Sequence, residues 1–343
     1  MLVSCWDKYL KRLPVQEQDI YFTEKYVSLC AEETGDVPEC FVYQEQGSLF
    51  FFLYLKRKVT WLQGEWYDFE TPYGYGGPLT NCLDKEFILR ASKVMFFEMK
   101  AAGLIAGFIR FHPLLANQQL LENTDGFQIV RDRQTVLMDL TLSEDELWRK
   151  SLHPKHRNSV REAEKAGAVF EVDENLTSLS EFVSLYHETM TRVEAGEFYF
   201  FSDRYFENLK KFKENVFLGL VRYEKRIAAA AIFFCWQDKG HYHLSASRES
   251  LQHLRPNNML IYKTALFMKS KGLKSLHLGG GTTPGEDDGL YKFKARFSPG
   301  RTDFYIGRAV LNQDRYDKAC RSWAMRYPDK DKDFSRMVLK YRF

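Results

Sequence analysis

The stretch VFLGLVRYEKRIAAAAIFFCWQDKGHYHLSASR, residues 216–248, decides the fold class. Its apolar runs at 216–223 and 227–236 flank the short polar turn Glu224-Lys-Arg226, a pattern that predicts an antiparallel hairpin. Residues 240–248 predict a third strand directly after it. Strands that follow one another this closely indicate a mostly antiparallel sheet.

The sequence on either side of this stretch predicts helices that alternate with further strands. Apolar residues recur at helical spacing between Leu179 and Met190, and a strand leaves through Gly279-Gly-Gly281. The expected elements are a strand over 168–173, helices over 179–190 and 203–212, the three strands above, a helix over 257–271, a strand over 273–278, a helix over 290–297 and a strand over 303–310.

Local signals place a boundary before this part of the chain. Ser143-Glu-Asp-Glu146 has the form of a capping box, and Pro154 begins a second helix over 155–166 that Gly167 ends. We therefore expect an N-terminal domain over 1–142, connecting helices over 143–167 and a C-terminal domain over 168–343. A single small module is excluded by the length of 343 residues.

The N-terminal part shows a similar element order. Residues 40–44 and 48–54 flank a Gln46-Gly47 turn, a helix over 85–102 ends at Gly103, and a strand follows over 105–111. The likeness lies in the order of elements and not in the residues. It predicts an α+β fold of two tandem domains, each a mixed, mostly antiparallel sheet flanked by helices.

Composition narrows the class of protein. The longest apolar run, residues 227–236, is about half the roughly 20 residues that a membrane-spanning helix needs. The first residues lack the apolar core of a signal peptide, and the six cysteines form no C-x-x-C pair, so we expect a cytoplasmic protein with reduced thiols and no metal. Formal charge is −5 over 1–140 and +8 over 141–343, which fits a C-terminal part that holds phosphorylated ligands.

Three strings of sequence are more specific than element order. They are Trp66-Tyr-Asp-Phe-Glu-Thr-Pro-Tyr-Gly-Tyr-Gly-Gly-Pro78, Lys155-His-Arg-Asn-Ser-Val-Arg-Glu-Ala-Glu-Lys-Ala-Gly167, and His277-Leu-Gly-Gly-Gly281 followed by Leu290-Tyr-Lys-Phe-Lys-Ala-Arg-Phe297. Together they resemble the Fem-type branch of the GNAT acyltransferases, in which one chain contains two GNAT units. The resemblance covers about residues 40 to 315 and implies acyl transfer to an amine.

Members of that branch differ in their acyl donor. Fem aminoacyl transferases take an amino acid from charged tRNA for a peptidoglycan precursor, whereas relatives use acyl-coenzyme A to acylate nucleotide-linked amino sugars. This sequence has no long helical insertion of the kind that some tRNA-using members carry. It is similar to the dTDP-3-amino-3,6-dideoxyhexose N-acyltransferases of surface polysaccharide synthesis (O-antigen, lipopolysaccharide or capsule), which implies acyl-coenzyme A as co-substrate and no nucleic-acid partner.

The donor site that the resemblance implies departs from the usual GNAT pattern. GNAT domains hold the coenzyme A pyrophosphate on a glycine-containing loop at a helix N-terminus, but residues 248–258 contain no glycine. Arg248, Arg255, Asn257 and Asn258 remain as candidate cofactor-binding residues, with a surface turn and helix cap as the alternative.

A strand beside that loop supplies the other donor-site candidates. His243, Ser245 and Ser247 alternate along it and are expected to share a face that lines the donor channel. The pair His241-x-His243 has a spacing that can ligate a metal, but no third ligand is evident. His243 is assigned to catalysis on the basis of the strand that commonly supplies the oxyanion donor in GNAT enzymes.

The other candidate residues come from the three strings. Substrate-binding candidates are Tyr67, Asp68, Tyr73, Tyr75, Arg157, Tyr291 and Lys294. The tyrosines of the glycine-rich string suit an acceptor wall, and a packed loop is the alternative. Arg157 and Lys294 suit phosphate; the alternative is a solvated charged face for Arg157 and a snorkelling surface lysine for Lys294.

Asp288 is the first candidate for taking the proton of the acceptor amine, and a capping acid at a helix start is its alternative. Direct attack of an amine on a thioester needs no enzyme nucleophile, and none is evident. Two other readings remain open: a tRNA-dependent aminoacyl transferase, and a non-catalytic nucleotide-sugar-binding protein.

Overall fold

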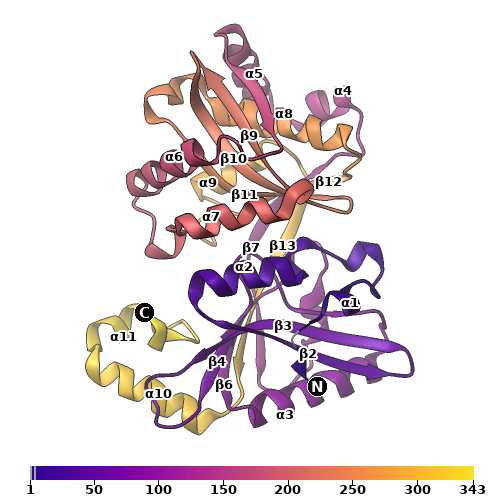
Figure 1. Cartoon of the computed structure of the whole chain (residues 1–343), viewed down its shortest axis with the longest axis vertical. Coiled ribbons are helices and arrows are strands. Elements are labelled where there is room, and N and C mark those ends of the chain that lie inside the picture. The colour runs from indigo at the N-terminus through magenta and orange to yellow at the C-terminus, as the bar shows by residue number, and fades with distance from the viewer. Residues whose placement is uncertain (1, 4) are drawn as a thin grey trace. The chain divides into compact units, whose positions relative to one another are not determined.

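The computed structural model describes residues 2, 3 and 5–343, which form two compact units. Unit 1 comprises residues 1–132 and 303–343, and unit 2 comprises residues 133–302. Strands β7 (Phe127–Asp139) and β13 (Arg301–Val310) each pass from one unit into the other (Figure 1). The division differs from the expected one, because residues 303–343 belong to unit 1 and the helices over 143–167 belong to unit 2.

Unit 1 contains a sheet in the order β1-β2-β3-β4-β6-β13, with β5 paired to β3. Only β4 and β6 run parallel among these pairs. The strands are β1 (Leu2–Val3), β2 (Val37–Glu45), β3 (Ser48–Lys58), β4 (Tyr67–Glu70), β5 (Pro78–Thr80) and β6 (Leu104–Arg110). The helices are α1 (Asp7–Leu10), α2 (Glu24–Thr34), α3 (Lys85–Ala101), α10 (Gln313–Arg326) and α11 (Pro328–Asp333).

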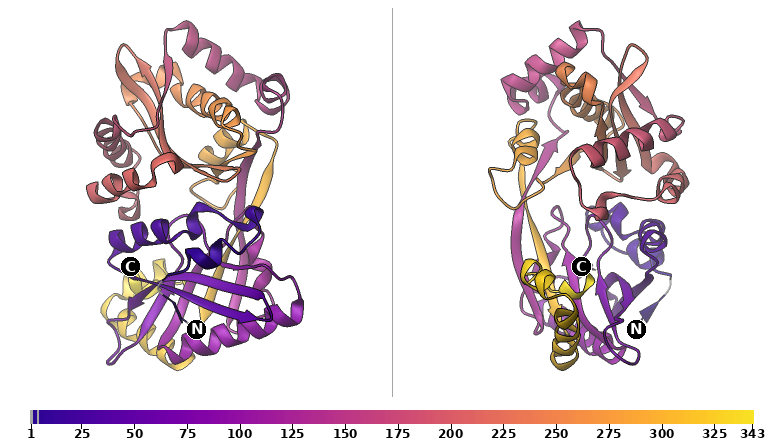
Figure 2. Two further views of the ribbon diagram at one scale, coloured as in Figure 1. Left: turned by 45° about the vertical axis from the view of Figure 1, so that its right-hand side comes forward. Right: turned by 90° about the vertical axis from the view of Figure 1, so that its left-hand side faces the viewer.

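Helices α3 and α10 cover opposite faces of this sheet (Figure 2). Ile109 of β6 packs with α3, whereas its neighbour Phe108 packs on the side of Trp323 of α10. Successive side chains of a strand point to opposite faces, so one apolar strand contributes to both cores. The C-terminal segment therefore belongs to unit 1 because it covers a face of this sheet.

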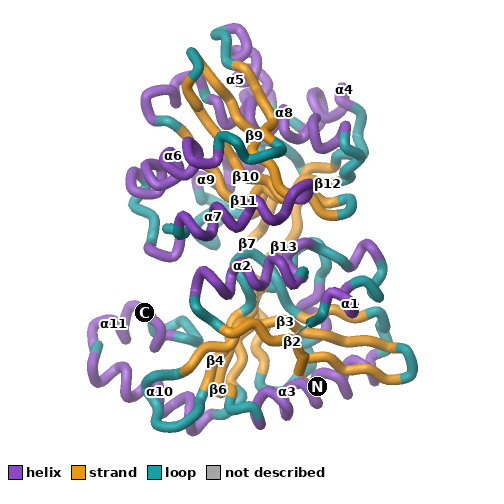
Figure 3. The backbone as a smooth tube through the Cα atoms, in the orientation of Figure 1, coloured by secondary structure: helices purple, strands orange, loops and turns teal. Residues whose placement is uncertain are grey.

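Unit 2 contains a sheet in the order β7-β12-β11-β10-β9-β8, in which only β11 and β12 pair in parallel. The strands are β8 (Val169–Asp173), β9 (Val216–Tyr223), β10 (Arg226–Trp236), β11 (Lys239–Ser247) and β12 (Ser275–Gly279). The helices are α4 (Glu144–Glu146), α5 (Pro154–Lys165), α6 (Leu179–Arg192), α7 (Asp203–Leu209), α8 (Pro256–Ser270) and α9 (Gly289–Ala295). Figure 3 shows them flanking the sheet.

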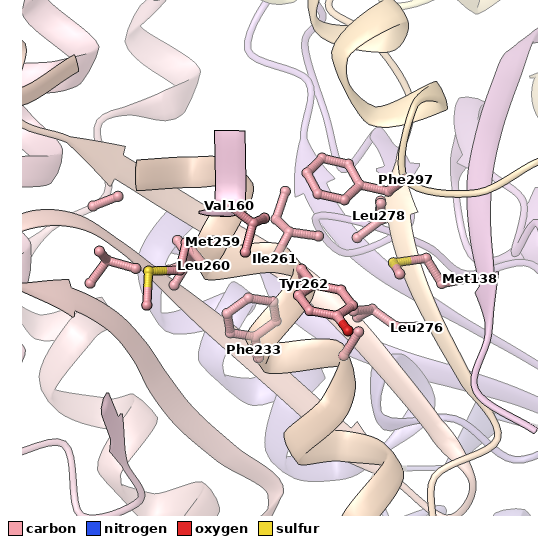
Figure 4. Close-up of a cluster of buried hydrophobic side chains, with 14 of the residues drawn as sticks. Met138, Val160, Phe233, Met259, Leu260, Ile261, Tyr262, Leu276, Leu278 and Phe297 are labelled. Atoms are coloured by element: carbon pink, nitrogen blue, oxygen red, sulfur yellow. The ribbon is translucent and has the colours of Figure 1, made fainter. Parts of the chain in front are cut away.

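The main core of unit 2 lies between this sheet and helices α5 and α8 (Figure 4). Val160 of α5, Phe233 of β10, Ile261 of α8 and Leu276 of β12 are each at most 1% exposed. Burying side chains of this size stabilises a fold by about 1.5–3 kcal/mol each. The core therefore fixes the two strands, β11 and β12, that form the candidate site.

The observed elements agree with the expected α+β class. The predicted hairpin is β9 and β10, and the predicted helix over 257–271 is α8. The capping box is present, since Ser143 Oγ accepts from the Glu146 amide and Glu146 accepts from the Ser143 amide. All six cysteines are free thiols. Among the described residues, no helix combines the length and apolar character needed to span a bilayer.

Candidate active site

The ladder between β11 and β12 ends partway along β11. The two strands pair from Lys239 and Ser275 to His241 and His277. Beyond that point, residues 242–247 pair with β10 on one side only, within the part of the chain that the structure describes. We call this divergence the strand split. It leaves one edge of β11 open to an extended ligand.

A β-bulge in β11 explains the split. Ile232 of β10 lies opposite Leu244 and the next residue, Phe233, lies opposite Tyr242, so His243 is an extra residue in β11. A bulge bends and twists its strand. The bend begins directly after His241, which is the last residue of β11 that pairs with β12.

The bulge also changes which side chains share a face. Residues directly opposite each other lie on the same face of the sheet, so Tyr242 and Ser245 lie on the face of Phe233 and Ala231. His243 instead contacts the rings of Phe234 and Tyr205. The expectation that His243, Ser245 and Ser247 share one face is therefore wrong.

His243 is held as a neutral imidazole. Its Nε2 lies 2.8 Å from the hydroxyl of Tyr205 in α7, and burial lowers its pKa to about 3. Ser247 is occupied through its backbone, because its amide donates to Thr189 Oγ1 at 3.2 Å and its carbonyl accepts from Arg192 Nη1 at 3.0 Å. These contacts attach β11 to α6 and α7.

Lys294 contacts both sides of the strand split. It lies in α9, is 7% exposed, and its Nζ donates to the carbonyl oxygen of Gly280 at 2.9 Å, just after β12. The same Nζ lies 5.5 Å from the centre of the Tyr242 ring in β11. Burial lowers the pKa of Lys294 to about 8. An ammonium group with this pKa is mostly charged at pH 7 and loses its proton as the pH rises past about 8.

Asp288 has the contacts of a helix cap. Its Oδ1 accepts from the amide of Tyr291, and its Oδ2 accepts from the amides and hydroxyls of Thr282 and Thr283. Despite partial burial, these bonds hold its pKa below its usual range. Gly281 leaves room for this carboxylate, since a Cβ there would lie 2.2 Å from Oδ1. The contacts favour the capping alternative over a general base, because a carboxylate with a lowered pKa binds a proton weakly.

The residues that precede α8 are engaged with neighbouring groups. Arg248 Nε donates to the Ile227 carbonyl at 3.0 Å, and Arg255 Nη1 lies 3.3 Å from Ser159 Oγ and 3.8 Å from Glu162.

Residues 249–254 form a 3₁₀ helix where a glycine loop would lie. Asn257 and Asn258 lie in the first turn of α8, and the buried Asn257 Oδ1 has no hydrogen-bond partner among the described residues.

Two residues of the Fem-like strings support local structure. Arg157 Nη1 donates to the carbonyls of Trp148, Arg149 and Leu152, which close the end of the preceding helical turn. Tyr291 donates its hydroxyl to Gln134 Oε1 at 2.8 Å. Both side chains therefore have protein partners in unit 2.

In unit 1, the predicted acceptor residues fall into two groups. Tyr67 contacts Glu65 through its hydroxyl and Lys56 through its ring. Asp68 is fully buried and pairs with Arg57 at 2.9 Å and Arg342 at 2.7 Å, so its carboxylate is occupied.

The second group is the glycine-rich aromatic loop. The Tyr73 carbonyl accepts from the Tyr26 hydroxyl at 2.7 Å, and the Tyr75 ring packs edge-on against Tyr21, His112 and Phe304. Tyr73 and Tyr75 remain partly exposed. Packing and hydrogen bonds within unit 1 therefore hold this loop, which presents partly exposed tyrosine rings.

Three features of the site could not be predicted from the sequence: the bulge, the Tyr242 ring beside Lys294, and the Tyr205 hydroxyl that contacts His243. A bulge leaves no mark in strand periodicity. The Phe-Lys-x-x-Phe motif was the one feature of the sequence that indicated this region of the site, and it marked Lys294.

Comparison with known proteins identifies a domain in this region. Residues 150–294 match the model of the acetyltransferase (GNAT) domain family. The match lies inside unit 2 and contains β11, β12 and Lys294. It identifies an acyltransferase domain of the GNAT type. No curated protein shows significant sequence similarity to the chain.

Three solved structures resemble this chain over 91% of its length. FemX has 17% identity and a TM-score of 0.68 over 91% of this chain and 96% of that chain. The C-terminal domain of a putative lysylphosphatidylglycerol synthetase from Agrobacterium fabrum has 17% identity and a TM-score of 0.59 over 91% and 94%. A tandem GNAT protein from the clavulanic acid pathway has 7% identity and a TM-score of 0.50 over 91% and 98%. At these identities the likeness shows the fold, which is that of tandem GNAT proteins.

Proposed function

We propose that the chain is an N-acyltransferase that moves an acyl group from a coenzyme A thioester to the amino group of a nucleotide-linked amino sugar. The observation that carries the proposal is the strand split between β11 and β12 with Lys294 at its origin. The GNAT domain match supports acyl transfer in general.

The open edge of β11 suits the amide-bearing arm of coenzyme A. Residues 242–246 present alternating N–H and C=O groups along one edge, whereas the backbone groups of Ser247 are bonded to α6. An extended arm that carries amides can hydrogen-bond to such an edge in the way that an added strand does. This arrangement would direct the thioester toward the origin of the split, where Lys294 lies.

The reaction needs no covalent enzyme intermediate. The neutral amine attacks the thioester carbonyl carbon, the carbon–sulfur bond breaks, and the proton lost by nitrogen accompanies the departing thiol. Negative charge develops on the carbonyl oxygen in the transition state. The Lys294 ammonium is the group placed to donate a hydrogen bond to that oxygen, an effect worth about 3–4 kcal/mol.

The acceptor class rests on the similarity of the chain, in size and motifs, to the dTDP-3-amino-3,6-dideoxyhexose N-acyltransferases within the Fem-type branch. The aromatic loop of Tyr73 and Tyr75 in unit 1 supports it, because partly exposed tyrosines suit a sugar or a base.

Purified protein incubated with acyl-coenzyme A thioesters and nucleotide-linked amino sugars should release free thiol only when both are present. A matched panel of the same nucleotides linked to sugars without an amino group serves as control. Equal thiol release with these controls would contradict amine acylation.

Transfer from aminoacyl-tRNA is the second candidate function. It is favoured by the 3₁₀ helix over Glu249–Leu254, which stands where a glycine loop would bind pyrophosphate, and by Arg255 being engaged with Glu162. In this case labelled amino acid passes from charged tRNA to an amine, with strong dependence on salt, and coenzyme A thioesters are inert. Binding of the nucleotide sugar with no turnover from either donor would instead support a non-catalytic binding protein.

A further inference from the structure

A cavity with a positive lining lies in unit 1. It has a volume of about 550 Å³ and is lined by the start of β7, by β13 and α10, and by the segment after α11. Its charged lining residues are Arg308 and Arg336, and no aspartate or glutamate is among the described residues that line it. We call it the arginine cavity.

The two guanidinium groups have no acidic partners in the described part of the chain. Arg308 is partly buried in β13, and Arg336 is exposed in the segment that follows α11. Most other arginines of unit 1 that lie on the sheet are paired, as Arg57 is with Asp68 and Arg110 is with Glu70. Two unpaired cations that line one hollow favour an anion there.

The neighbouring polar groups add donors and no negative charge. Gln128 and Ser335 line the cavity, and burial raises the pKa of Tyr316, so its hydroxyl stays neutral. Asp317, the next residue along α10, accepts a hydrogen bond from Gln313 at 2.8 Å and does not line the cavity. The remaining wall is apolar and includes Phe127 and Met337.

We propose that the arginine cavity binds a small phosphorylated molecule whose phosphate contacts Arg308 and Arg336 and whose apolar or planar part lies on the wall. The volume is within the usual range for small-molecule sites. Arginine forms paired hydrogen bonds with phosphate oxygens. The site lies within unit 1 and does not depend on the acyl-transfer proposal.

Calorimetric titration with inorganic phosphate and with phenyl phosphate tests the proposal. We expect saturable binding of both, with phenyl phosphate at least fivefold tighter because its ring covers the apolar wall. The variants Arg308→Gln and Arg336→Gln should each weaken phenyl phosphate binding at least tenfold. Arg321→Gln, which removes an exposed charge from α10 outside the cavity, is the matched control and should change binding less than twofold.

Three results would overturn the proposal: absence of saturable binding, equal weakening by Arg321→Gln, or unchanged binding in the Arg336→Gln variant. Arg336 is exposed, so its substitution leaves the fold intact even if Arg308→Gln does not. Thermal unfolding of each variant checks the fold directly.

Discussion

Among single residues, Lys294 is the one on which the proposed acyl transfer depends. The Lys294 side chain is 7% exposed, and its ammonium group is hydrogen-bonded to a backbone carbonyl. Burial disfavours the charged form of this group, and no carboxylate contact compensates in full, so the pKa of Lys294 is lowered to about 8. Between about pH 8 and pH 10.5, the ordinary pKa of lysine, the unfolded chain binds more protons at Lys294 than the folded chain does. The free energy of unfolding therefore increases in this range as the pH rises.

Substituting Lys294 separates its role in activity from its effect on stability. Lys294→Met should lower the acyl-transfer rate by about 10²–10³-fold, since the developing oxyanion loses its donor. The free energy of unfolding at pH 7 should stay equal or rise by up to about 3 kcal/mol, because a buried charge is removed.

Wild-type activity should decline above about pH 8 as the ammonium deprotonates, as pH–rate profiles would show. A Lys294→Met variant within threefold of wild type would contradict this role.

Asp288 offers a test of capping against base catalysis. Asn retains capping ability but cannot accept the amine proton, whereas Ala does neither. We therefore expect Asp288→Asn to keep activity within about fivefold, and Asp288→Ala to lose about 1 kcal/mol of stability. Steady-state kinetics and thermal unfolding measure these effects. A loss of about 10²-fold or more in Asp288→Asn would assign Asp288 to proton transfer.

The sequence could single out Lys294 but could not give its neighbours. The Phe-Lys-x-x-Phe phrase marked this lysine through the Fem-like resemblance. The Tyr242 ring in β11 and the Gly280 carbonyl just after β12 lie 52 and 14 positions away in the sequence, and only the folded sheet brings them to Nζ. Likewise, sequence offered Asp68 as a sugar ligand, but tertiary contacts with Arg57 and Arg342 occupy it.

At the element scale, hydrophobic patterning located most helices and strands to within a few residues, as β9, β10 and α8 illustrate. Patterning failed where a strand departs from regular alternation. The extra residue His243 in β11 shifts the following residues to the opposite face, so Ser245 lies with Tyr242. Helix α2 and strand β7 were also not expected, because both mix polar and apolar residues without a clean period.

Removing the bulge residue tests its role in the split. Deletion of His243 restores regular pairing between β10 and β11, so β11 should stay straight and the split should close. We expect acyl transfer to fall at least 100-fold. His243→Ala keeps the residue count and the bulge, and should retain activity within tenfold. Equal losses in the two variants, measured as thiol release, would show that the imidazole matters and the bulge does not.

At the scale of the whole molecule, the chain returns to unit 1 after unit 2. Strand β13 pairs with β6, and Trp323 of α10 is 1% exposed against the same sheet. The sequence predicted that residues 303–343 belong to the C-terminal domain, because they follow it directly in the chain. Pairing between strands far apart in sequence leaves no local signal, so this return was not predictable.

The Arg342 side chain tests this assignment. It lies one residue from the C-terminus, and its Nε contacts the fully buried carboxylate of Asp68 in β4 at 2.7 Å. Arg342→Met should destabilise unit 1 by about 1–3 kcal/mol, because Asp68 keeps only Arg57. Hydrogen exchange should accelerate in β3 and β4 and stay unchanged in β9 and β10. Arg321→Met is the exposed control. Faster exchange in β9 and β10 would contradict the assignment.

Hydrogen exchange of the backbone amides over residues 242–246, measured with and without bound coenzyme A, shows whether the thioester lies along the strand split. We expect coenzyme A to slow exchange at alternate amides of this segment of β11, while exchange in the paired segment of β11 over 239–241 stays unchanged. If saturating coenzyme A leaves residues 242–246 unprotected and slows exchange elsewhere in unit 2, the thioester does not bind at the strand split.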